Sequence, residues 1–85
     1  MLLSNKYGQT ALHRAAALGL VSISRTLIES APARLRTNFV DAKDNEGNTA
    51  LHMAVQDKHE ECIAALLESG ARRDIKNNEG QLAMP

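Results

Sequence analysis

The chain has 85 residues, and its ten Lys and Arg residues are balanced by ten Asp and Glu residues, so its formal net charge is zero. This balance argues against a nucleic-acid partner, because proteins that bind the phosphate backbone carry an excess of basic residues. Apolar stretches are only a few residues long, whereas a membrane-spanning helix needs roughly 20. We therefore expect a soluble protein of the cytoplasm, the nucleus or both, with neither a nucleic-acid nor a membrane partner.

The apolar residues of the chain are mostly small. Hydrophobic residues make up 44% of the sequence, yet Tyr7 and Phe39 are its only aromatic residues. The core must therefore be built from Ala, Leu, Ile and Val, which favours closely packed helices. Cys62 is the only cysteine, so no disulfide within the chain can support a core of this modest size.

A duplicated segment organises the sequence. The tetrapeptide Thr-Ala-Leu-His occurs at 10–13 and again at 49–52, and each copy is preceded by a Gly two residues upstream. The tripeptide Asn-Glu-Gly at 45–47 recurs 33 residues later at 78–80. We expect one repeat over about 5–40, a second over about 41–73 and a partial third over 74–85.

Each repeat is expected to contain two short helices. Thr10 and Thr49 suit the N-cap position, because their hydroxyls can accept hydrogen bonds from the first backbone N–H groups of a helix. The apolar spacing after them predicts helices over about 11–18, 21–29, 50–57 and 60–68.

Turns are expected between these helices. Gly19 lies between the first pair, and Lys58 takes the equivalent position in the second pair. Gly70 suits the position just after a helix. The segments 41–48 and 74–81 are rich in Asn, Asp and Gly, which is typical of turns.

The segment at about 31–38 is expected to be a loop inserted into the first repeat. The two tetrapeptides lie 39 residues apart, six more than the period of 33. Pro32 prevents a helix from continuing, and Arg34 and Arg36 favour exposure to solvent.

The 33-residue period, with Thr-x-Leu-His-x-Ala at the start of a helix, resembles the ankyrin repeat. The resemblance implies an all-α fold, a solenoid of helix-turn-helix units joined by β-turn or hairpin-like loops. Departures are Ala11 and Ala50, where the family usually has Pro, and Lys58, where it has Gly. Because such arrays usually contain three or more repeats, we expect a fragment of a longer array, able to self-associate through its exposed ends.

No residue pattern indicates catalysis, a metal or a cofactor. The resemblance implies that His13 and His52 are structural, with rings bound to the neighbouring Thr and to the adjoining turn. His52 and His59 are seven residues apart, unlike the zinc-binding pair four residues apart on a helix. Cys62 is expected to be packed inside, without a base to activate its thiol. We therefore expect a non-catalytic protein with no cofactor and no metal.

The resemblance implies that a partner protein binds one extended surface formed by the turn tips and the first helix of each repeat. Tyr7 and Arg14 are favoured anchors because Tyr and Arg are enriched in binding hot spots, and an exposed Met53 between them is hard to justify by packing alone. The expected partner-binding residues are Lys6, Tyr7, Gln9, Arg14, Leu18, Asn45, Glu46, Asn48, Met53, Gln56, Asp57 and Glu79.

Charge divides this expected surface. Lys6 and Arg14 lie toward one end, whereas Glu46, Asp57 and Glu79 lie toward the other. We therefore expect a partner with a basic patch opposite the later repeats.

A narrower resemblance concerns three stretches, HRAA at 13–16, DNEGNTALH at 44–52 and the last partial repeat at 77–85. They are similar to the C-terminal repeats of gankyrin-type proteasome assembly chaperones. This implies a chaperone that binds the C-terminal domain of an ATPase subunit of the proteasome base. The alternative is a general ankyrin adaptor in signalling or transcription with an unidentified partner, and an enzyme is a more distant possibility.

Overall fold

The computed structural model describes residues 7–83, and it is helical over that range. Its helices are α1 (Ala11–Ala17), α2 (Val21–Ser30), α3 (Ala33–Val40), α4 (Ala50–Gln56) and α5 (Glu60–Glu68). No strand forms between residues 7 and 83, although Lys76 and Leu82 are joined by an isolated antiparallel bridge. The expected all-α architecture is therefore confirmed.

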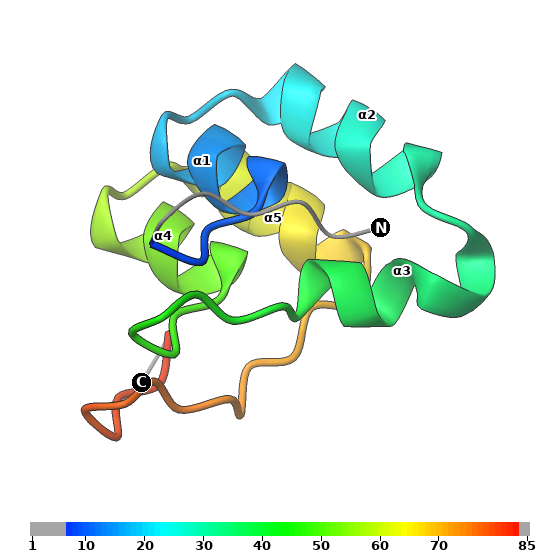
Figure 1. Cartoon of the computed structure of the whole chain (residues 1–85). Coiled ribbons are helices and arrows are strands. Elements are labelled where there is room, and N and C mark those ends of the chain that lie inside the picture. Colours follow the sequence, from blue (N-terminus) through cyan, green and yellow to red (C-terminus); the bar gives the residue numbers. More distant parts are fainter. Residues whose placement is uncertain (1–6, 84–85) are drawn as a thin grey trace.

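Two helical hairpins stack side by side. Helices α1 and α2 form the first hairpin and α4 and α5 form the second, with α1 packed against α4 and α2 against α5 (Figure 1). The segments that precede α4 and follow α5 run below the helices in this view. This arrangement leaves α1 and α4 as one layer, beside the turns that connect the repeats.

The core between the hairpins is built from small and branched aliphatic side chains. Leu12, Leu51 and Leu66 are its largest fully buried members, and Ala16 and Ala54 let the helices approach closely. Cys62 lies in the same core as a free, buried thiol, as the sequence predicts. Because four of the ten residues in this core cluster are alanines, the helices pack closely without aromatic side chains between them.

The predicted helices match the observed ones closely. The predicted 60–68 coincides with α5, and the other three differ from observation by one residue at the C-terminal end. Gly19 and Lys58 both adopt left-handed backbone, with φ of +73° and +59°, which confirms their equivalence as turn residues. Gly70 follows the C-cap of α5 with φ of +91°, also as predicted.

The prediction of a loop over 31–38 is wrong, because most of this segment forms α3. Pro32 does end α2, but it also occupies the N-cap position of α3, where a missing N–H carries no penalty. The guanidinium of Arg36 donates to the carbonyls of Ile28 at 3.2 Å and Ala31 at 3.2 Å, which satisfies the end of α2. Val40 is buried in the core and fixes the far end of α3.

None of the helices between residues 7 and 83 has the length and apolar character needed to cross a bilayer.

Candidate protein-interaction surface

Each Thr-Ala-Leu-His segment builds the start of a first helix in the same way. The Thr10 hydroxyl accepts from the His13 backbone N–H at 3.3 Å, and the Thr10 backbone N–H donates to His13 Nδ1 at 3.1 Å. This reciprocal arrangement is a capping box, and Thr49 and His52 repeat it with an N–H to Nδ1 distance of 3.1 Å. The predicted N-caps are confirmed.

The two histidines also tie each repeat to the next turn. Because Nδ1 accepts from a backbone N–H, the ring proton lies on Nε2, which donates to a carbonyl. His13 Nε2 donates to the Asn48 carbonyl at 2.8 Å, and His52 Nε2 donates to the Gln81 carbonyl at 3.0 Å. The structural role expected for both histidines is confirmed, since both ring nitrogens are used within the chain.

The environment of His13 favours its neutral form. Burial lowers the pKa of the His13 ring, and the Asn48 carbonyl and the charge of Asp44 oppose this shift only in part. A second ring proton would also point at the Thr10 N–H that Nδ1 accepts. His13 is therefore suited to a fixed hydrogen-bonding role.

An acceptor side chain at the start of each turn organises it. Asp44 Oδ1 accepts from the backbone N–H groups of Glu46 at 2.9 Å and Asn48 at 2.8 Å. Asn77 Oδ1 does the same for Glu79 and Gln81, both at 2.9 Å. These turns hold Glu46 and Glu79 at equivalent, exposed positions one repeat apart.

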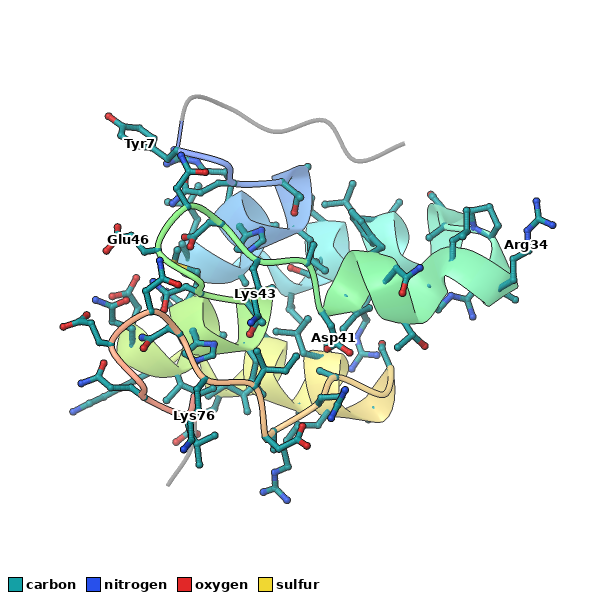
Figure 2. The ribbon with its side chains drawn as sticks, turned by 60° about the horizontal axis from the view of Figure 1, so that its bottom comes forward. Tyr7, Arg34, Asp41, Lys43, Glu46 and Lys76 are labelled. Atoms are coloured by element: carbon teal, nitrogen blue, oxygen red, sulfur yellow. The ribbon has the colours of Figure 1, made fainter. Side chains whose placement is uncertain are left out.

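Successive turns are joined backbone to backbone. The N–H of Asn45 donates to the Tyr7 carbonyl at 2.9 Å, and the N–H of Asn78 donates to the Glu46 carbonyl at 2.9 Å. The turn tips thus form a continuous row along one edge of the molecule, from which Tyr7 and Glu46 project (Figure 2). The close approach depends on glycine, because a Cβ at Gly47 would lie 2.6 Å from Asn78 Oδ1 and 2.7 Å from Asn78 N.

The predicted binding residues divide by exposure. Among those on the turns, Gln9 and Asn48 are half-buried. The exposed ones are Tyr7, Arg14, Leu18, Asn45, Glu46, Gln56, Asp57 and Glu79. Tyr7 is 57% exposed and Leu18 is 59% exposed, so two large apolar groups face solvent beside α1. Lys6 lies outside the described residues.

Met53 differs from its expectation. The sequence suggests an exposed methionine, but Met53 is half-buried and packs against the core cluster. It also lines a groove beside α4. Packing therefore accounts for part of Met53, whereas its contribution to binding stays a prediction.

A groove beside α4 brings five of the predicted residues together. It measures about 360 Å³ and lies between α4 and the turn that follows α5. The predicted residues that line it are Glu46, Asn48, Met53, Gln56 and Glu79. Tyr7, Arg14 and Leu18 do not line this groove, so the expected surface has two parts.

Sequence reasoning did not select the remaining lining residues as binding residues. These are His52, Val55, Asn77, Gln81, Leu82 and Ala83. Leu82 carries the clearest signal in the sequence, because it occupies the register position of the N-cap residues Thr10 and Thr49 yet is apolar and 40% exposed. A side chain that departs from the repeat in this way is a candidate for contact with another molecule.

Two ion pairs between residues 7 and 83 lie away from the groove. They join Arg25 to Glu68 and Arg72 to Asp74. The hydrogen bond from Arg72 lowers the pKa of the Asp74 carboxyl. Neither pair involves a residue of the groove. Between residues 7 and 83, no three metal-ligating side chains gather at one place.

Comparison with known protein families gives a match over nearly the whole chain. The family described as ankyrin repeats (3 copies) matches residues 1–79. The match includes both capping boxes, both helical hairpins and most of the last turn.

Individual relatives differ widely in kind. The transient receptor potential cation channel subfamily A member 1 homolog of Caenorhabditis elegans is 36% identical over 74 residues, which are 87% of this chain and 6% of that protein. Ankyrin repeat and SOCS box protein 2 of Mus musculus is 33% identical over 73 residues, which are 86% of this chain and 11% of that protein. Ankyrin repeat domain-containing protein 13C of Homo sapiens is 44% identical over 46 residues, or 54% of this chain and 8% of that protein. The chain thus spans about a tenth or less of the length of these relatives.

Proposed function

Since this chain belongs to the ankyrin-repeat family, we propose that it is a non-catalytic module that binds another protein through its turn tips, α1 and α4. The observation that carries the proposal is the groove beside α4, where five side chains from two turns and one helix converge. Repeats of this kind present such surfaces because each repeat is packed only against its neighbours. The proposal includes a cytoplasmic or nuclear location.

Exposed groups along α1 support the same surface. Ala11, Arg14 and Leu18 are exposed at spacings of three and four residues, so they share one face of the helix. Tyr7 lies at the turn that precedes them and is also exposed. A tyrosine, an arginine and a leucine in a row offer both apolar area and a cation to a partner.

The test compares variants of this surface with a distant control. The chain is used to capture a partner from cell extract, the partner is identified and purified, and its affinity is measured by isothermal titration calorimetry. Tyr7→Ser and Arg14→Ala should each weaken binding about fivefold or more, as expected for hot-spot residues. Arg34→Ala, on α3 and exposed, should leave the affinity unchanged. Equal affinities for all three variants would contradict the proposal, as would substrate turnover by the isolated chain.

A narrower form of the proposal names the partner as an ATPase subunit of the proteasome base. The similarity of residues 44–52 to gankyrin-type repeats supports it, as does the acidic character of Glu46, Asp57 and Glu79. The alternative is an adaptor in signalling or transcription, and the variety of the relatives described above favours keeping it. Direct titration of the chain with the purified C-terminal domains of the base ATPase subunits separates the two, since only the narrower form requires binding.

A further inference from the structure

We propose that the groove beside α4 takes a basic segment of the partner, with an arginine side chain reaching the carboxylates of Glu46 and Glu79. The inference rests on the proposed function, because it gives the chemistry of the partner at part of the same surface. It is carried by the charges of the groove and by the apolar side chains that line it.

The charged side chains that line the groove are both acidic. Glu46 and Glu79 belong to consecutive turns, and no Lys or Arg is among the lining residues. Neither carboxylate takes part in the ion pairs found between residues 7 and 83. The hydrogen bond from the Asn78 N–H to the Glu46 carbonyl holds the two turns together at 2.9 Å. Two carboxylates that line one groove, with no Lys or Arg among the other lining residues, attract a positive group.

The donor set of arginine suits these two carboxylates. A guanidinium has five N–H donors and no acceptor, and it binds carboxylates through charge-assisted hydrogen bonds.

His52 also lines the groove, but its ring nitrogens are not available to bind a partner. His52 accepts the Thr49 N–H through Nδ1 and donates to the Gln81 carbonyl through Nε2. Both ring nitrogens are therefore occupied within the chain, and the ring serves as part of the wall.

The floor of the groove suits the apolar stem of a long basic side chain. Met53 and Val55 are half-buried, and Leu82 is 40% exposed. Arginine and lysine lay their methylene groups along such surfaces while their charged ends remain at polar groups. A volume of about 360 Å³ lies at the low end of the range for binding pockets and admits one or two side chains.

Other occupants fit less well. An acidic segment would bring like charges to Glu46 and Glu79. An apolar helix would bury both carboxylates without a partner, and removing unpaired charges from water is costly. The groove therefore favours a cationic segment over either of these.

The test uses short capped peptides and the full chain. Peptides of alternating Gly and Arg, Gly and Lys, or Gly and Glu are titrated into chain with labelled methyl groups, and nuclear magnetic resonance shifts are followed. We expect saturable shifts of the Met53 and Leu82 methyl groups with the arginine peptide, weaker shifts with the lysine peptide and none with the glutamate peptide. A lysine peptide that binds as tightly would overturn the assignment of arginine.

Matched double variants separate the groove from general attraction. E46Q with E79Q should weaken the arginine peptide on the order of threefold to tenfold, the sum expected for two exposed charge pairs. E60Q with E61Q removes the same charge from exposed positions on α5 that do not line the groove, and it should leave the affinity unchanged. Equal weakening in both double variants, or shifts confined to residues outside the groove, would overturn the inference.

Failure of this inference can be told apart from failure of the proposed function. If Tyr7→Ser and Arg14→Ala weaken the natural partner but E46Q with E79Q does not, the surface stands and the basic segment in the groove is refuted. If none of these variants changes the affinity of the partner, the proposed function itself is refuted.

Discussion

The close approach of successive turns predicts a specific cost for adding one methyl group. Gly47 has φ of +79°, and a Cβ there would lie 2.6 Å from Asn78 Oδ1 and 2.7 Å from Asn78 N. One of these atoms belongs to the backbone, so it cannot move without shifting the next turn. Gly80 has nearly the same conformation, with φ of +75°, but nothing lies within 4 Å of its Cβ position. Both Gly47→Ala and Gly80→Ala therefore place alanine in left-handed backbone, but only Gly47→Ala also brings a methyl group against Asn78.

The magnitudes follow from these two terms. Left-handed backbone costs alanine about 1–2 kcal/mol, and about 0.4–1 kcal/mol of this is offset because alanine restricts the unfolded chain. Gly80→Ala should therefore lower the free energy of unfolding by about 1 kcal/mol. Gly47→Ala also disrupts the hydrogen bonds from Asn78 to the carbonyls of Glu46 and Asn45, which adds about 1–2 kcal/mol. The total for Gly47→Ala is then about 2–3 kcal/mol.

The measurement is urea unfolding followed by circular dichroism, with both variants and the parent chain fitted to one two-state model. At a slope of about 1–2 kcal/mol per M of urea, the two variants should differ by about 1 M in midpoint. Equal midpoints would refute the reasoning, because they would mean that the turns are not in contact at Gly47 or that the contact contributes nothing to stability.

Three further predictions concern single residues. Lys58 has left-handed backbone with φ of +59°, so Lys58→Gly should raise the free energy of unfolding by about 0.5–1 kcal/mol in urea titrations, the relief of strain less the entropy of glycine; a loss of stability would contradict this. Burial lowers the pKa of His13, so the unfolded chain binds more protons once the pH falls below about 6.5, and stability that is complete above that pH is lost as the pH falls toward the lowered pKa. The parent chain should therefore lose unfolding free energy between about pH 7.5 and about pH 5, and His13→Gln should lose less, because glutamine does not bind this proton. An equal loss in both chains would contradict the role of His13. Thr49→Val keeps the size of the side chain but removes the hydroxyl that caps α4, which should cost about 1–2 kcal/mol in the same assay, whereas Thr49→Ser should retain most of the stability.

Most of the secondary structure could be predicted because its signals are local. The Thr and the His of each capping box lie only three residues apart in the sequence, and each copy forms one at the start of a helix. Left-handed turns at Gly19 and Gly70 are expected from glycine alone. Where two copies of a segment carry the same local chemistry, the same structure follows in both.

Helix α3 could not be predicted from local signals in its sequence. Pro32 correctly indicates the end of α2, but whether a helix follows depends on contacts made elsewhere. Arg36 satisfies carbonyls at the end of α2, and Val40 enters the core. Both contacts require the chain to fold back on itself, so residue preferences in 31–38 carry little information about them.

The interaction surface shows the same division. The sequence by itself determined the repeat, the N-caps and the turns that expose Glu46 and Glu79, because these depend on residues a few positions apart or on an exact period. Only the tertiary structure decided that α4 and the last turn enclose a groove, and that Met53 is half-buried at its floor. The physical reason is that the groove forms only when packing brings α4 and two turns together. Its lining residues are far apart in the sequence, so no local pattern predicts which of them face one another.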